Sequence, residues 1–430
     1  SISMIQYLLI GLNGFTVFAN LVCNAHYVSW LPDFFESNGL DSTWNGVAEG
    51  VQAAAAIFSC FFAMWLTKRV RNVLIAPIVA SVQSFLSIFC GLVGQALSGT
   101  VLGVFMILVR LCFGLMDGVM MVSLNATVMR LVPEARAPTF MAFMQACNAA
   151  AIMLAPLIGS QFYSTMGFAL PFVIVGIALL VGALLHCTLL HFAPRDVGRQ
   201  EERPGADPRD LLLKPSIVAS VLITVAFVVP SASAEPGVEP YLTAPPFNLS
   251  VDDVGLIFSL GGLSQVLGTL LAPLGAMAIG HLGSIYLAAL VAFTAQLLNA
   301  RAPQLLGIYI SCSVVQSLTQ GWMLVIASPL MMRVCRSYAL EPKMFAETIF
   351  SALWASFCLS FVVFGPIGGA FISAIGFRDW TLVTAIIILF VVPAATYIGF
   401  HPKVMGVELA PMPVEGETAT THKQAPLPKG

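Results

Sequence analysis

Charged residues are scarce in this sequence. Only 9% of its residues are Asp, Glu, Lys or Arg, whereas soluble domains carry about 25%. Hydrophobic residues make up 58% of the chain, and its mean hydropathy is +0.91. This composition excludes an ordinary soluble domain and indicates a protein that crosses a membrane many times. The lipid is therefore an expected partner, and nucleic acid is not.

Motifs of enzymes and metal sites are also missing. The sequence has no Gly-x-Ser-x-Gly elbow, no His-Glu-x-x-His pair and no phosphate-binding Gly-x-x-x-x-Gly-Lys loop. Its six histidines are dispersed, and its nine cysteines show neither metal-ligand spacing nor a disulfide framework. We therefore expect no enzyme, no metal and no cofactor.

Long apolar runs fill most of the chain. About 20 apolar residues cross the hydrocarbon core as a helix, and the runs lack the two-residue alternation of a membrane barrel. We predict an all-α membrane protein with 12 transmembrane helices, the first of which is too long for the core of a cleaved signal peptide. The expected spans lie near residues 5–31, 44–66, 73–96, 101–131, 138–163, 169–192, 215–243, 252–278, 283–300, 305–332, 345–374 and 380–400.

One long polar stretch, residues 191–214, divides these helices into two sets of six. It contains five basic residues, five acidic residues and three prolines, which is typical of a flexible connector. We predict a six-helix bundle over residues 1–193, a cytoplasmic linker over 194–214, a second six-helix bundle over 215–400 and a disordered cytoplasmic tail over 401–430.

Basic residues are distributed unevenly between the two ends of the spans. If both termini face the cytoplasm, 16 of the 19 Lys and Arg lie on the cytoplasmic side, as the positive-inside rule expects. The exceptions are Arg301 and Arg378 on the other side and Arg110 within a span. The 16 are Lys68, Arg69, Arg71, Arg130, Arg136, Arg195, Arg199, Arg203, Arg209, Lys214, Arg333, Arg336, Lys343, Lys403, Lys423 and Lys429.

The two halves share a short internal sequence repeat, which we call the echo. The fifth span carries "LAPLIGSQFYSTMGF" at residues 154–168, and the eleventh carries "FGPIGGAFISAIGF" at residues 364–377. Each has Pro among small residues and a closing Gly-Phe, which indicates a duplication. Repeat-built transporters bind their substrate between the repeats. Close helix packing is the simpler explanation of the small residues, and both can hold.

These patterns resemble the major facilitator superfamily over residues 5–400. "LVRLCFGLMDG" at residues 108–118 follows the superfamily's fourth-helix Arg-x-x-x-Gly pattern through Arg110 and Gly114. The resemblance implies a fold of two six-helix halves that rock about a central site.

Two further segments carry the resemblance. The echoed segments, through Pro156 in one and Gly365, Pro366 and Gly369 in the other, are similar to the Gly-Pro signature of antiporters. The loop after the second helix, "LTKRVRN" at residues 66–72, keeps basic residues at Lys68 and Arg69. It lacks the Asp and Gly of the superfamily's gating loop.

Residues 238–268 resemble the seventh and eighth helices of the vesicular amine transporters, where an acidic residue precedes Pro. The acids that monoamine and acetylcholine carriers use in helices ten and eleven are replaced here by Leu324 and Ala355. The similarity is therefore greater to the polyamine-transporter branch. It implies antiport of an amine or polyamine against protons.

Two glutamates stand in the seventh span, in "SASAEPGVEPY" at residues 231–241. The prolines there, at positions 230, 236 and 240, are predicted to kink or open the helix. Glu235 and Glu239 are four residues apart and share a face. A charge at mid-bilayer costs at least about 2.5 kcal/mol, so it usually faces a cavity. We predict that Glu239, supported by Glu235, binds a proton and an ammonium group in turn; the alternative is that both are hydrated or cap the helix.

Asp117 is the second deep acid. It follows Arg110 by seven residues, or two helical turns of about 10 Å, so the two share a face without needing to touch. Asp117 is either a second substrate carboxylate, with Arg110 tuning a proton step, or half of a self-neutralising Arg-Asp pair. The Asp that amine carriers have in the first helix is also missing here, and Asn20 and Asn24 are the nearest polar candidates. The faces of Tyr241, Trp322 and Trp354 suit a cation, although aromatic residues are common in helix bundles.

We interpret the chain as a monomeric secondary active transporter. We expect it to exchange a small organic cation, an amine or polyamine, for protons by alternating access in an intracellular vesicle membrane or the plasma membrane. The alternatives are a plasma-membrane exporter of drugs or other organic cations, and a transporter-like sensor that no longer moves cargo.

Overall fold

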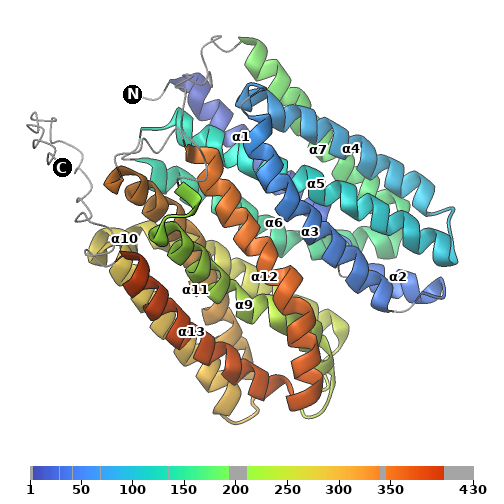
Figure 1. Ribbon diagram of the computed structural model, residues 1–430. Helices are drawn as coiled ribbons and strands as arrows, with labels where there is room; N and C mark the ends of the chain where they lie inside the picture. Colours follow the sequence, from blue (N-terminus) through green and yellow to red (C-terminus); the bar gives the residue numbers. More distant parts are fainter. Residues whose placement is uncertain are drawn as a thin grey trace, which may run out of the picture.

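The computed structural model describes residues 3–28, 30–40, 42–67, 69–133, 136–192, 211–338 and 345–400. Within these ranges all regular structure is helical, which confirms the predicted all-α class (Figure 1). The helices are α1 (Met4–Ala25), α2 (Leu31–Ser37), α3 (Ser42–Leu66), α4 (Asn72–Gly94), α5 (Gly99–Leu131), α6 (Ala137–Met166), α7 (Ala169–Phe192), α9 (Pro215–Thr243), α10 (Val251–Arg301), α11 (Leu306–Ser337), α12 (Ala346–Ile375) and α13 (Phe377–Phe400).

Eleven helices in the described part of the chain are long and apolar enough to cross a membrane. One of them, α10, is 51 residues long and is interrupted at Gly280, where φ is 74° and ψ is 168°. Glycine adopts a positive φ without steric cost, so the chain can reverse direction there. Because α10 makes two passes, the helices agree with the 12 predicted spans.

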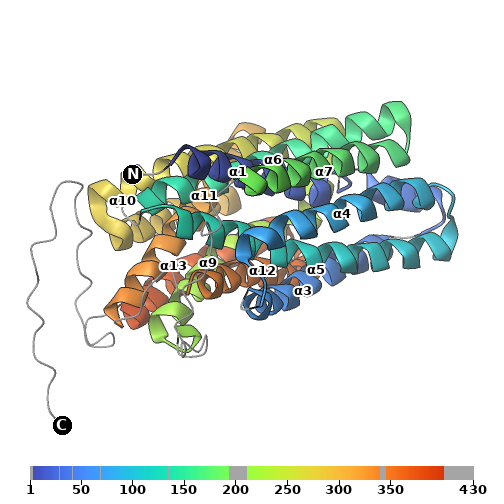
Figure 2. The ribbon, with the colours of Figure 1, turned by 90° about the horizontal axis from the view of Figure 1, so that it is seen from above.

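The helices run roughly parallel and form two bundles, α1 to α7 and α9 to α13 (Figures 1 and 2). Helix α1 begins and α13 ends on one side of the molecule, which we name the terminal side; the opposite side, where the short α2 lies, is the far side. The bundles meet where α12 packs on α3 and α5, and where α10 packs on α6.

The sequence echo corresponds to a structural repeat. Helices α6 and α12 are both 30 residues long, and each contains its predicted proline, Pro156 or Pro366. Each ends at a glycine with positive φ, Gly167 at 77° and Gly376 at 87°. The closing Gly of each echo is therefore a helix stop on the far side.

Small residues in the echo allow close backbone approaches at equivalent places in the two bundles. A Cβ at Gly159 would overlap the backbone of His26 at the end of α1, and a Cβ at Gly368 would overlap the backbone of Ser233 in α9. The residue that α9 approaches so closely is thus Gly368, which the sequence analysis did not select. Gly365 lies farther from α9, with Ala232 O at 3.7 Å from a Cβ built there.

Helix α9 corrects one prediction. It is continuous from Pro215 to Thr243, so of the two predicted effects of prolines 230, 236 and 240, a kink or an opening, the opening is wrong and the kink stays a prediction. Each proline removes only one backbone donor, and membrane helices tolerate this where neighbouring helices support the chain. Helices α12 and α13 pack along α9 and provide that support.

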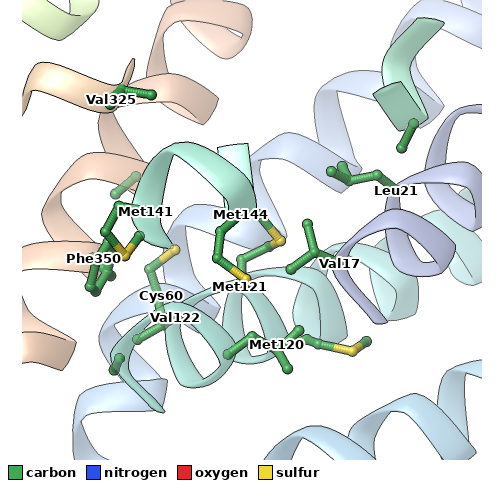
Figure 3. Close-up of a cluster of buried hydrophobic side chains, with 14 of the residues drawn as sticks. Val17, Leu21, Cys60, Met120, Met121, Val122, Met141, Met144, Val325 and Phe350 are labelled. Atoms are coloured by element: carbon green, nitrogen blue, oxygen red, sulfur yellow. The ribbon is translucent and has the colours of Figure 1, made fainter. Parts of the chain in front are cut away.

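The buried core is continuous across both bundles and rich in methionine. Figure 3 shows Met121 of α5 close to Met144 of α6, and Met141 of α6 beside Phe350 of α12. Methionine side chains are flexible and fill irregular gaps. Such a contact between bundles can repack with little strain when the bundles move.

Candidate functional site

Asp117 lies near the middle of α5 and is 6% exposed. Its Oδ1 accepts hydrogen bonds from Asn20 Nδ2 at 2.7 Å and from Asn24 Nδ2 at 3.1 Å, both on α1. Its Oδ2 accepts one from Trp354 Nε1 of α12 at 3.0 Å. Among the described residues no basic side chain forms a salt bridge with it. The carboxylate is thus held by neutral donors from both bundles.

Glycines allow α3 to pack closely on α5 at this level. A Cβ at Gly114 would overlap the carbonyl oxygen of Gln52, and a Cβ at Gly118 would overlap the hydroxyl of Ser59. Ser59 Oγ in turn donates to the carbonyl oxygen of Gly114 at 3.1 Å. The predicted motif glycine Gly114 therefore has a structural role, because it brings Gln52 within reach of Arg110.

Arg110 lies two turns from Asp117 toward the far side and is 2% exposed. Its Nη1 donates to Gln52 Oε1 at 2.6 Å, and its guanidinium carbon lies 3.4 Å from the centre of the Tyr27 ring. Glu49 Oε1 is 3.9 Å from its Nη2. Arg110 is therefore paired with other groups, and the self-neutralising Arg110–Asp117 pair does not form.

Amide side chains connect Arg110 to Asp117 indirectly. Gln52 Nε2 donates to Asn24 Oδ1 at 3.4 Å, and Gln83 Nε2 of α4 donates to the same oxygen at 3.3 Å. Sequence analysis missed both glutamines, because an amide within an apolar run has no motif that separates it from an ordinary helix contact.

A small pocket lies between the bundles beside Asp117. Trp354 belongs to both features, because its N–H bonds Asp117 and its ring lines the pocket. The Trp354 and Phe357 rings stack with centroids 5.1 Å apart. The pocket is mostly apolar, with amide and hydroxyl groups at its edge, and is lined by Met121, Asn125, Gln145, Leu324, Ser328, Phe350, Leu353, Trp354 and Phe357.

One face of α12 carries the polar contacts between the bundles. Glu347 forms an ion pair with Arg130 of α5 at 2.6 Å, and Ser351 Oγ donates to the carbonyl oxygen of Cys60 in α3 at 2.7 Å. Trp354 completes this row, since residues at i, i+4 and i+7 share a helix face. In the described part of the chain, these contacts run from the level of Asp117 to the terminal side.

The remaining predicted residues lie elsewhere. The backbone of Glu235 and Glu239 belongs to α9, but their side chains lie outside the described residues, as does Lys68. Arg69 is exposed, and its guanidinium lies over the Trp65 ring at 4.5 Å. Gly369 is half-buried on α12.

Comparison with known proteins gives the family. The family model of the Major Facilitator Superfamily matches residues 7–242, which is more than half of the chain. A search of curated proteins found no match. Among solved structures, the chain resembles a bacterial homologue of the human lysosomal transporter Spinster, solved in an inward-facing and unoccupied conformation. The similarity covers 93% of this chain and 98% of that one, with a TM-score of 0.61 and 15% identity, and supports the fold alone. This chain belongs to the Major Facilitator Superfamily of membrane transporters.

Proposed function

We propose that this protein is a secondary active transporter that exchanges a small organic cation, an amine or polyamine, for protons. The observation that carries the proposal is Asp117, a buried carboxylate that is held by neutral donors and lies beside a pocket between the two bundles.

The chemistry follows from burial of a charge. A buried carboxylate with no adjacent cation is costly to keep ionised, and either a proton or an ammonium group can neutralise it. The two cannot occupy the same oxygen together, so binding of one favours release of the other. Competition at one site, combined with access from each side in turn, produces antiport.

The pocket suits an organic cation with an apolar body. The rings of Trp354, Phe350 and Phe357 offer apolar surface, and the face of an aromatic ring attracts a cation. Asn125 and Ser328 add polar groups at its edge. A strongly hydrated inorganic ion would gain little from such a lining, because few oxygen ligands are present to replace its water.

Alternating access requires the α12 contacts to break and reform. Arg130–Glu347, Cys60–Ser351 and Asp117–Trp354 join the bundles from the centre to the terminal side. If the bundles rock apart on this side, all three contacts are lost together. We assign the terminal side to the cytoplasm on the basis of its basic residues.

Glu235 and Glu239 remain predicted carboxylates of the same pathway. Their spacing on α9 places them on one helix face, so a polyamine with two ammonium groups has a second anionic partner available. The membrane is an intracellular vesicle or the plasma membrane, as the sequence resemblance implies.

Uptake into proteoliposomes tests the proposal. Purified protein is reconstituted into vesicles that are acidic inside, and labelled spermidine and a panel of monoamines are added outside. We expect uptake of at least one of these amines that disappears when an ionophore collapses the proton gradient. Uptake that does not depend on the gradient would exclude proton antiport, and no uptake of any amine would exclude the substrate class and favour a sensor.

A further inference from the structure

Gln52 of α3 connects Arg110 to the site at Asp117 without touching Asp117 itself. We propose that Gln52 is a positioning residue of the cation site, which fixes the orientation of the Asn24 amide so that Asn24 presents N–H groups to Asp117. This inference rests on the proposed function for its effect on transport, whereas the orientation itself can be tested without transport.

The orientation of the Gln52 amide is set by two donors. Its Oε1 accepts from Arg110 Nη1 at 2.6 Å and from the Tyr27 hydroxyl at 2.8 Å. A guanidinium has donors and no acceptor. Rotating the amide by 180° would therefore place N–H groups against the N–H groups of Arg110. Arg110 is itself held in place over the Tyr27 ring, so Gln52 Oε1 stays directed toward it.

Asn24 receives its orientation from Gln52. Because Gln52 Oε1 already accepts from Arg110 and Tyr27, the Nε2 group of Gln52 faces Asn24 and donates to Asn24 Oδ1. Asn24 Nδ2 then faces Asp117 Oδ1 at 3.1 Å and Asn20 Oδ1 at 3.2 Å. A reversed Asn24 would bring its carbonyl oxygen against the carboxylate and remove one of the donors that stabilise the ionised form.

Gln83 cannot supply this orientation, although it donates to the same Asn24 oxygen at 3.3 Å. Its Oε1 is buried and has no hydrogen-bond partner among the residues that the structure describes. Among those residues no donor to Oε1 therefore fixes the direction of the Gln83 amide. Gln83 is a suitable matched comparison for Gln52, since both reach Asn24 with the same chemistry.

The arrangement separates the two oxygens of Asp117. Oδ1 accepts hydrogen bonds from Asn20 and Asn24, whereas Trp354, whose ring lines the pocket, is the only donor to Oδ2 among the described residues. An ammonium group that enters from the pocket thus meets Oδ2. If Asn24 reverses, the ionised carboxylate loses stabilisation at Oδ1, and the cation competes less well with the proton.

Gln52 accepts hydrogen bonds from Arg110 and Tyr27 and donates one to Asn24, and a glutamate at position 52 separates these two roles. Gln52→Glu keeps an acceptor for Arg110 and Tyr27 but has no N–H for Asn24. Gln83→Glu introduces the same charge next to the same Asn24 oxygen, and Gln161→Glu introduces it at an exposed position on α6. In the uptake assay we expect Gln52→Glu to raise KM at least tenfold with Vmax within twofold. We expect Gln83→Glu to raise KM by less than threefold and Gln161→Glu to change neither constant.

Equal increases in KM for Gln52→Glu and Gln83→Glu, or a fall in Vmax alone, would overturn the proposal. Thermal unfolding of the purified protein supplies a second measurement that needs no transport. If Gln52 acts through Asn24, Gln52→Glu lowers Tm in the natural chain but not in an Asn24→Leu background. If the decreases in Tm caused by Gln52→Glu and Asn24→Leu simply add, the proposal is overturned. If the decreases are not additive but the natural chain takes up no amine, only the proposed function is overturned.

Discussion

The ion pair between Arg130 and Glu347 is expected to control opening of the terminal side. The two side chains are only 12% and 6% exposed, and their charged atoms lie 2.6 Å apart across the bundles. Glu347→Gln keeps the shape and one acceptor but removes the charge. A hydrogen bond to a charged group contributes about 1.5–3 kcal/mol, and a neutral one about 0.5–1.5 kcal/mol. The substitution therefore weakens the closed state by about 1–2 kcal/mol.

This change in free energy predicts a measurable shift in population. Since about 1.4 kcal/mol corresponds to a factor of ten, the open population on the terminal side should rise by about 5- to 30-fold. Cys60 is a natural reporter, because it is fully buried and its carbonyl oxygen accepts from Ser351 of α12. In a chain whose other cysteines are replaced by serine, we expect a water-soluble maleimide to label Cys60 faster by that factor.

Two outcomes would refute this reasoning. Labelling of Cys60 at the original rate in Glu347→Gln would show that the ion pair does not hold the terminal side closed. The reversed pair, Arg130→Glu with Glu347→Arg, should slow labelling again relative to either single reversal, and failure to do so would contradict a direct pairing. Size-exclusion chromatography and Tm of each variant separate local opening from global unfolding.

Three further predictions concern Gly114, Trp354 and Glu239. Gly114→Ala should lower Tm by several degrees, because its Cβ would overlap the Gln52 carbonyl oxygen and push α3 away from α5; an unchanged Tm would contradict the tight packing. Trp354→Phe keeps an apolar ring but removes the hydrogen bond to Asp117, so KM for the amine should change by about threefold or more while Tm changes little. Unchanged uptake kinetics would show that this hydrogen bond is unimportant for transport. Glu239→Gln should reduce gradient-driven uptake at least tenfold, whereas full uptake would show that this carboxylate is only structural.

The fold could be predicted from the sequence because the length of a hydrophobic run and the residues that end a helix are local properties. The 12 spans followed from apolar runs, and the echo located the glycines that end α6 and α12. The predicted opening of α9 was wrong because the cost of a proline depends on neighbouring helices, which a single span does not show. Gly368 was missed for a similar reason, since its role depends on which face of α12 meets α9.

The site was only partly accessible from the sequence. Asp117 could be selected, because a carboxylate deep in an apolar run is conspicuous. Asn20 and Asn24 were selected only through the resemblance, as the polar residues nearest to the missing first-helix Asp. The bond from Trp354 to Asp117 joins residues 237 positions apart, and it depends on helix rotations that no periodicity specifies. The same holds for Gln52, whose importance appears only when its Arg110 and Asn24 partners are known.

If Asp117 binds the cation, equilibrium binding reveals this without any need for transport. A labelled amine that the natural protein transports is titrated against detergent-purified natural protein and Asp117→Asn. Loss of a charge-assisted hydrogen bond of about 1.5–3 kcal/mol should weaken binding by about 10- to 150-fold, with Gln161→Glu unchanged. Equal affinity of the natural protein and Asp117→Asn, with both well folded, would show that the cation binds elsewhere.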